Sequence, residues 1–228
     1  MTTTYGYDKA SRVVAETGAA VKNEITATTH TAKITRDYDE DGNLLSETTA
    51  DTTGGDTARA TTYHYNEHGL NDTVTDAEQN TTLLAHDELG RVKGMTDPAG
   101  THVSYTYTPR GQHATTVLDD WTGDPSGTIR DLTVQSNAYD PAGRLASTTD
   151  AMGATTSYTY FDDGLPATTT AKQVTQTDGT KHDIVLEANS YNPAGHLTKQ
   201  VTASGKTTQT YTVDALGRTE TSVLDPAA

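Results

Sequence analysis

Short runs in which apolar and polar residues alternate recur along the chain and predict β-strands. In the segment 101–107 the residues Val103, Tyr105 and Tyr107 are two apart, and the same spacing occurs at Tyr5/Tyr7, Tyr63/Tyr65, Tyr158/Tyr160 and Tyr211/Val213. Because residues i and i+2 share a face of a strand, each pair is expected to lie on one face. If neighbouring hairpins stack in register, the paired tyrosines form a cross-strand ladder, and we expect this face to be the better buried one.

A seven-residue phrase, Tyr-Asp-x-x-Gly-Arg-Leu, punctuates these strands and predicts their turns. Its cleanest copy spans residues 139–145, and weaker copies begin at Tyr7, Tyr38, Tyr65, His86, Tyr107, Tyr160, Tyr191 and Val213. Asp favours the first position of a turn, where its carboxylate caps backbone N–H groups, and Gly supplies the left-handed position that closes the loop. The residues that we expect to define the repeat are Tyr7, Asp8, Tyr38, Asp39, Gly42, Tyr65, Gly69, Asp87, Gly90, Arg91, Tyr107, Gly111, Tyr139, Asp140, Gly143, Arg144, Tyr160, Gly164, Tyr191, Gly195, Asp214, Gly217 and Arg218.

The spacing of the phrase predicts a continuous antiparallel meander. Successive copies are 31, 27, 21, 21, 32, 21, 31 and 22 residues apart, and two strands of about six residues with two turns of about four account for the shortest step. A second set of turns is expected at Asp97–Gly100, Asp150–Gly153 and Ala203–Gly205. Longer strands on either side of one turn would absorb the four long steps, one of them a hairpin over 172–188 around Asp178-Gly179. Helix is disfavoured in these Thr-rich, Gly-punctuated segments.

Composition narrows the class of protein. The 228 residues carry a net charge of −15 and no Cys, which argues against nucleic-acid partners and anionic membrane surfaces and excludes a disulfide framework. Neither a signal-peptide pattern nor an apolar run long enough to span a membrane is present in the sequence. Hydrophobic residues make up 32% of the chain, so we expect a thin core and a strip of sheet that is exposed to solvent on one or both faces.

We expect a single array, residues 1–228, of about nine repeats without a domain boundary. The last residues, 224–228, resemble 96–100 but stop at the turn. We therefore expect the chain to be a fragment of a longer repeat protein.

The repeated phrase resembles the YD-repeats of rearrangement-hotspot (Rhs) proteins, insecticidal toxin complexes and teneurins. The segment 139–145, followed by 149–153 and by Tyr158 and Tyr160, is close to the family pattern. The resemblance implies an all-β fold in which a repetitive antiparallel β-hairpin strip curves or spirals into part of a shell. It also implies that further YD-repeats and a toxin or effector domain of a secreted or cell-surface parent protein are the partners. The protease residues that end many bacterial shells have no counterpart here, so none is carried over.

Several motifs suggest chemistry, but each has a simpler structural interpretation. Asp37 to Gly42 resembles the start of a calcium loop, yet the twelfth position is Thr48 rather than a bidentate acid. Asp119, Asp120 and Asp124 suit a hard cation but more commonly form a solvated acidic loop. Trp121 is a candidate for sugar stacking, although an isolated Trp in an insertion more commonly packs over the neighbouring hairpin. We assign no catalytic, cofactor or metal residues, and we expect no nucleic-acid partner and no membrane insertion.

The sequence therefore favours a non-enzymatic structural segment of a β-shell that encloses or displays a toxin or effector polypeptide. The alternative is an extracellular glycan- or protein-binding module that uses exposed Tyr, Trp121 and the hairpin 172–188.

Overall fold

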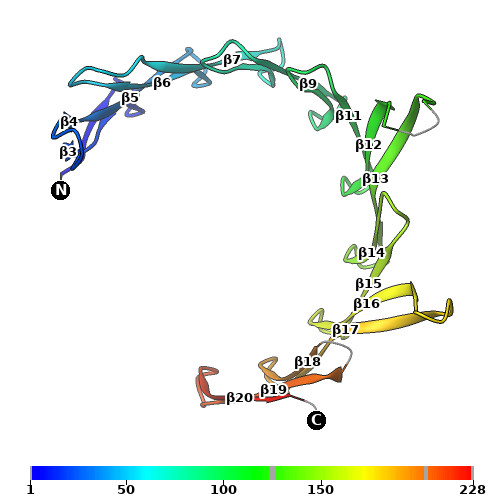
Figure 1. Cartoon of the computed structure of the whole chain (residues 1–228). Coiled ribbons are helices and arrows are strands. Elements are labelled where there is room, and N and C mark those ends of the chain that lie inside the picture. Colours follow the sequence, from blue (N-terminus) through cyan, green and yellow to red (C-terminus); the bar gives the residue numbers. More distant parts are fainter. Residues whose placement is uncertain (1, 124–126, 203–204, 227–228) are drawn as a thin grey trace. The chain divides into compact units, whose positions relative to one another are not determined.

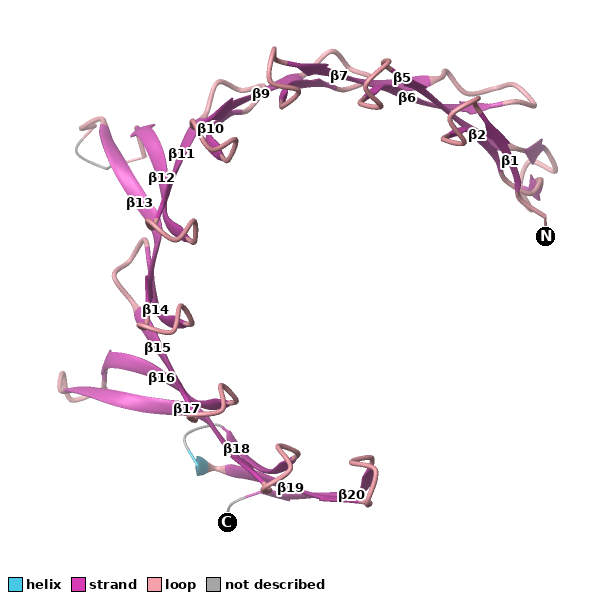
Figure 2. Ribbon diagram, turned by 180° about the vertical axis from the view of Figure 1, so that it is seen from behind, coloured by secondary structure: helices cyan, strands magenta, loops and turns pink. Residues whose placement is uncertain are grey.

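The described chain is built from β-strands joined by short turns (Figures 1 and 2). The structure is a computed structural model that describes residues 2–123, 127–202 and 205–226. It divides into two compact units, Met1–Ser104 and Tyr105–Ala228. The predicted turn at Ala203–Gly205, the acid Asp124 and the last two residues fall wholly or partly outside the described residues.

The strands of the first unit are β1 (Thr4–Tyr7), β2 (Val13–Thr17), β3 (Val21–Lys22), β4 (Thr29–His30), β5 (Ala32–Tyr38), β6 (Leu44–Asp51), β7 (Arg59–Tyr65), β8 (Asn71–Thr75), β9 (Thr81–His86) and β10 (Val92–Thr96). Strand β11 (His102–Tyr107) runs across the division. The strands of the second unit are β12 (His113–Trp121), β13 (Arg130–Tyr139), β14 (Leu145–Asp150), β15 (Thr155–Tyr160), β16 (Pro166–Thr175), β17 (Lys181–Tyr191), β18 (Leu197–Thr202), β19 (Thr207–Val213) and β20 (Thr219–Pro226). Within residues 2–123, 127–202 and 205–226, no helix has the length and apolar character needed to cross a bilayer.

Strands that follow one another along the chain pair antiparallel, as in β1–β2, β5–β6 and β19–β20. The exception is the β3–β4 hairpin, which forms a two-stranded sheet of its own while β2 pairs with β5. The all-β hairpin meander is therefore confirmed. The register shifts just before the tyrosine of the phrase, for example between Asp37 and Tyr38 and between Ala138 and Tyr139. A turn followed by a left-handed residue produces this one-residue bulge in three-residue hairpin loops. Alternate turns of a meander lie at opposite edges of the sheet, so all copies of the phrase within one unit share an edge.

The described residues include no buried side chain, apolar or polar. A typical domain buries the faces of its sheets or helices between two layers, whereas these strands form a single layer. The tyrosine face is nevertheless better covered at four places. Tyr63, Tyr65, Tyr105, Tyr107, Tyr158, Tyr160 and Tyr211 are half-buried, while His64, Thr106, Thr159 and Thr212 between or beside them are exposed. Tyr5 and Tyr7 are the exception, with 52% and 61% exposure.

The long steps are accommodated in two ways. The hairpins β12–β13 and β16–β17 have strands of 9, 10, 10 and 11 residues, as expected from the sequence. The hairpin over 172–188 turns at Gln176–Thr180 around Gly179. The first long step differs, because the short β3–β4 hairpin supplies the extra residues instead of longer strands.

Candidate functional site: the edge of tyrosine-linked turns

The nine turns at the copies of the phrase share one geometry, and we call them the motif turns. They span residues 8–12, 39–43, 66–70, 87–91, 108–112, 140–144, 161–165, 192–196 and 214–218. In each, the N–H of the first residue donates to the carbonyl of the fifth, and the N–H of the fourth donates back to the carbonyl of the first. The fourth residue is left-handed, with φ of +86° at Gly143, which explains the Gly of the phrase because a Cβ disfavours this region.

The carboxylate of a first-position Asp holds its turn together. In the turn 140–144, Oδ1 of Asp140 accepts the N–H of Arg144 at 2.8 Å, and Oδ2 accepts Nε of Arg144 at 2.7 Å. The backbone N–H of Arg144 is the main cause that holds the pKa of Asp140 below its ordinary value. The pKa values of Asp8 and Asp214 are lowered mainly by the same backbone N–H, and those of Asp39 and Asp87 mainly by the side chain of the residue four places on.

The arginine of the phrase links its own turn to the next motif turn. The guanidinium of Arg12 lies 4.8 Å from the ring centre of Tyr38, and its Nη1 donates to the carbonyl of Asp39 at 3.0 Å. Arg144 repeats this arrangement, 4.6 Å from the ring centre of Tyr160 and 3.1 Å from the carbonyl of Phe161. A cation over an aromatic face contributes about 0.5–1 kcal/mol at exposed sites.

Gln112 replaces the arginine in the turn 108–112, yet the same turn still reaches the next one. Nη1 of Arg110 donates to the carbonyl of Pro141 at 2.8 Å, and Nε2 of Gln112 donates to the carbonyl of Gly143. The link between turns therefore tolerates a change of residue.

The tyrosine hydroxyl makes a second link in the opposite direction along the array. The donor is the tyrosine that directly precedes a motif turn. The acceptor is the backbone carbonyl of the residue that directly follows the previous motif turn. Five such bonds of 2.8–3.3 Å join Tyr38 to Val13, Tyr65 to Leu44, Tyr139 to His113, Tyr160 to Leu145 and Tyr191 to Pro166. The sequence interpretation missed this role, although 12 Tyr against 1 Phe was a signal that the hydroxyl is used.

These contacts replace the tyrosine ladder that the sequence predicted for several of the rings. Arginine covers Tyr38 and Tyr160, while Tyr105 and Tyr107 lie about 6 Å from the ring of His113. Tyr191 meets Phe161 edge to face at 5.8 Å.

The strand register between motif turns is constant. For example, Ser147 lies seven places after Asp140, the first residue of its motif turn, and pairs with Ser157, which lies four places before Phe161, the first residue of the next. The same two offsets give a pair between every two successive motif turns. The pairs are Ala15–Thr35, Ser46–Thr62, Thr73–Leu83, Gly94–Ser104, Thr115–Ser136, Ser147–Ser157, Thr168–Ala188 and Lys199–Thr210. Long and short steps obey the same rule, so the added residues lie beyond the paired segment at the other edge.

Two turns lack the Gly of the phrase; the sequence predicted the turn after Tyr7 from Asp8, but it missed the turn at 76–80. Ser11 at φ +63° closes the turn 8–12, and Gln79 at φ +66° closes a turn at 76–80 on the opposite edge. Asp8 and Asp76 provide the same caps as elsewhere, so Asp at the first position was the usable signal.

Grooves between successive motif turns are the main hollows of this edge. One of about 800 Å³ lies between the turns 66–70 and 87–91 and is lined by His68, Leu70, Asp72 and His86 among others. His86 stands where most copies of the phrase have tyrosine. A groove of about 360 Å³ lies beside Phe161 and Tyr191.

Trp121 ends strand β12 and has a covered face. The guanidinium of Arg130, on β13, lies 5.0 Å from the centre of its ring, and Gly123 packs so closely that a Cβ there would clash with the indole. Asp119 and Asp120 lie on the same strand. A sugar would have to displace Arg130 to stack on that face.

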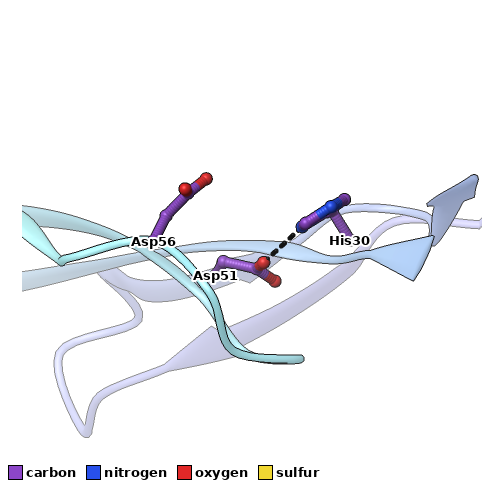
Figure 3. A group of neighbouring side chains, drawn as sticks. All are labelled: His30, Asp51 and Asp56. Atoms are coloured by element: carbon purple, nitrogen blue, oxygen red, sulfur yellow. Dashed lines mark hydrogen bonds and ion pairs between the residues drawn. The ribbon is translucent and has the colours of Figure 1, made fainter. Parts of the chain in front are cut away.

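His30, Asp51 and Asp56 form the cluster best suited to a metal among the described residues (Figure 3). Nδ1 of His30 is 2.6 Å from Oδ2 of Asp51, and Oδ1 of Asp51 accepts the N–H groups of Thr31 and Thr53. The hydroxyl of Thr53 and the His30 imidazole lower the pKa of Asp51. These contacts tie His30 and Asp51 to the backbone, and Asp51 acts as a cap for the loop that follows β6.

The segment Asp37–Gly42, which resembles the start of a calcium loop, leads into a motif turn. Asp39 caps the turn 39–43, Asp37 accepts the hydroxyl of Ser46, and Glu47 accepts Nε of Arg36. The carboxylates therefore serve the hairpin and do not converge on one point.

Comparison with known proteins agrees with this geometry. Residues 86–129 and 139–181 match the family described as RHS Repeat. No curated protein matches the sequence. The fold matches the crystal structures of TcdB2-TccC3-Cdc42 (16% identity, TM-score 0.56), of TcdB2-TccC3 without its hypervariable C-terminal region (16%, 0.54) and of TcdB2-TccC3-TEV (12%, 0.51). These matches cover 95%, 95% and 98% of this chain but 14% of each of those chains.

Proposed function

The chain belongs to the Rhs family of YD-repeat proteins, and we propose that it forms a structural β-wall that encloses or displays another polypeptide of its parent protein. The observation that carries this proposal is the recurring linkage of the motif turns. Tyrosine hydroxyls join five pairs of successive motif turns, and side chains of the earlier turn, from Arg12, Arg110, Gln112 and Arg144, reach the next turn in three of the pairs. These contacts use polar groups to hold neighbouring hairpins together in a constant register. Repeats that contact only their neighbours build extended surfaces of this kind.

The exposed apolar side chains support a wall that contacts another polypeptide. The single layer leaves its faces uncovered, and the third position of two motif turns carries Leu89 and Leu216, each 77% exposed. Met152, at the tip of an opposite turn, is 94% exposed. Apolar surface that a sheet cannot cover by itself commonly marks a site of protein contact.

The family assignment also supports the nature of the partners. Further repeats and an effector polypeptide would complete the assembly, since the chain spans 14% of the length of the structures that it resembles. We place the parent outside the cell or at the cell surface and give this segment no catalytic role. The alternative, a glycan- or protein-binding module, rests on exposed Tyr, Trp121 and the hairpin 172–188. The Arg130 contact described above gives sugar stacking on the covered face of Trp121 no support.

Protease accessibility in the parent protein tests this proposal. One protease site is inserted at Met152 and, in a second variant, one in the polypeptide that the reading frame encodes beyond the repeats. A wall that encloses its cargo leaves the second site resistant until urea unfolds the sheet, whereas the turn site is cut at once. Cutting of both sites at equal rates, together with separation of the cut polypeptide from the chain on size exclusion, would overturn the proposal.

A further inference from the structure

A histidine and two aspartates from three segments of the first unit converge beside the loop between β6 and β7 (Figure 3). His30 ends strand β4, Asp51 ends strand β6, and Asp56 lies in the loop that follows. One ring nitrogen of His30 and one carboxylate oxygen of each aspartate all lie within 4.8 Å of one another. Among residues 2–123, 127–202 and 205–226, these are the only three such side chains whose ligand atoms lie close enough to share an ion.

The pairing of β5 with β6 brings these residues together, although they are distant in the sequence. Ala32 pairs with Asp51, so His30, two places before Ala32, lies beside the end of β6. The loop after β6 then passes close to His30, since a Cβ on Gly55 would lie 3.9 Å from the imidazole. His30, Asp51 and Asp56 line one hollow of about 120 Å³.

The two ring nitrogens of His30 already have the partners that a metal-ligating imidazole needs. Nδ1 faces Oδ2 of Asp51 at 2.6 Å, and Nε2 lies 2.9 Å from Oγ1 of Thr28. A ligating imidazole commonly donates its second ring N–H to an oxygen, which fixes the tautomer that coordinates through the other nitrogen. With the proton on Nε2 and donated to Thr28, the lone pair of Nδ1 is directed into the cluster.

The aspartates supply oxygen ligands and a local excess of negative charge. The Asp51 side chain is 8% exposed, and its Oδ1 accepts two backbone N–H groups, which leaves Oδ2 directed at His30. Asp56 is exposed and has no hydrogen bond or ion pair within the described residues. Arg59 lines the same hollow, but in the described part of the chain it pairs with neither carboxylate. A cation between the two carboxylates would offset their mutual repulsion.

We propose that His30, Asp51 and Asp56 bind one divalent transition-metal ion, with Zn²⁺ as the best match to the donors. An imidazole nitrogen with carboxylate oxygens suits zinc, whereas Ca²⁺ and Mg²⁺ prefer oxygen ligands alone. Ligand atoms around a tetrahedral zinc ion lie about 3.3 Å apart. The 2.6 Å gap between His30 and Asp51 opens to that value, and Asp56 closes to it on its exposed loop. Water completes the coordination.

The bound ion would fasten an insertion to the array. Strands β3 and β4 form a two-stranded sheet of their own, whereas β6 belongs to the long sheet. His30 comes from the small sheet and both aspartates from β6 and its loop, so one ion joins the two. This role goes beyond the proposed wall, because none of the links between motif turns uses these three residues.

Equilibrium dialysis of the full chain against Zn²⁺ tests the site. We expect the wild type to bind one ion that H30Q and D56N each weaken by about tenfold or more. D56N is the more decisive variant, because Asp56 makes no other contact within the described residues, whereas Asp51 also caps its loop. H64Q is the matched control, since His64 and Asp72 form an equivalent 2.6 Å pair that has no third ligand among the described residues. Its affinity for Zn²⁺ should equal that of the wild type.

Hydrogen exchange locates the bound ion. Zn²⁺ should slow amide exchange in residues 29–31 and 51–58 of the wild type but not of D56N, and Ca²⁺ at the same concentration should change neither. Wild-type chain that retains no Zn²⁺, D56N that binds it as tightly as the wild type, or H64Q that loses as much affinity as H30Q would overturn the proposal. Each of these results would leave the proposed β-wall unaffected, because protease accessibility tests that proposal separately.

Discussion

At the residue scale, the side chains of the phrase each make two stabilising contacts. Asp140 caps its own turn through Oδ1 and orients Arg144 through Oδ2. Arg144 then covers the ring of Tyr160, whose hydroxyl returns to the carbonyl of Leu145. Three residues thereby join one turn to the next without a buried core.

Replacement of Tyr160 by Phe tests the hydroxyl alone. The ring and its arginine contact remain, while the 2.9 Å bond to Leu145 is lost. We expect Y160F to lower the free energy of unfolding by about 0.5–1.5 kcal/mol, the net value of a typical hydrogen bond, in urea denaturation. The matched control is Y158F on the same strand, because the Tyr158 hydroxyl has no hydrogen-bond partner among the described residues. Equal losses for the two variants would show that the hydroxyl link contributes nothing.

At the element scale, the hairpin is the repeating unit and its left-handed residue fixes the geometry. Turn length stays constant at five residues, while the strands and loops at the other edge vary to absorb steps of different length. The register rule therefore holds from β2–β5 to β18–β19, and insertions do not disturb the tyrosine-linked edge.

Two glycine substitutions in the first unit should have opposite effects. Gly69 has φ of +71° with open space around its Cβ position, so G69A tests backbone strain only. We expect a loss of about 1–2 kcal/mol, the cost of a left-handed conformation for an L-residue. Gly94 lies in strand β10, where a Cβ would meet Ala85 at an ordinary 3.7 Å. G94A should raise the free energy of unfolding by about 0.5–1 kcal/mol. Thermal unfolding measures both variants, and unfolding temperatures that shifted in the same direction would contradict this account.

At the scale of the whole molecule, stability is distributed along the sheet rather than concentrated in a core. None of the described side chains is buried, so hydrophobic burial is partial everywhere. Many small polar contacts, among them the turn carboxylates, hold the layer together. The net charge of −15 adds repulsion, which salt screens beyond about 8 Å at physiological ionic strength.

The turn carboxylates make stability sensitive to acid. The pKa values of Asp8, Asp87, Asp140 and Asp214 are lowered from 3.8 in the folded chain by the N–H groups and arginine of their turns. A lowered folded pKa means that the stabilisation is complete above the unfolded value and is lost as the pH falls through the folded one.

We therefore expect the unfolding temperature, measured at constant ionic strength, to be steady between pH 6 and 5 and to fall below about pH 4. The variant D140N keeps the shape of the turn but cannot titrate, so its unfolding temperature should depend less on pH than that of the wild type. An unfolding temperature that rose on acidification would show that charge repulsion outweighs the turn contacts.

Sequence alone determined most of the elements and their order, but not the short β3–β4 hairpin. Alternation placed the strands, and Asp with Gly placed most turns, because these signals act within a few residues. The left-handed conformations of Ser11 and Gln79 were not predicted, because no local sequence signal indicates that a non-glycine residue will adopt this conformation.

Only the tertiary structure showed which residues meet between repeats. The bond from Tyr160 to Leu145, the position of Arg12 over Tyr38 and the constant register join residues far apart along the chain, and pairing across that distance depends on how strands align. Local residue preferences determine where each hairpin forms. The alignment of one hairpin with the next determines which groups the tyrosine hydroxyl and the arginine contact, and thus that they link successive repeats.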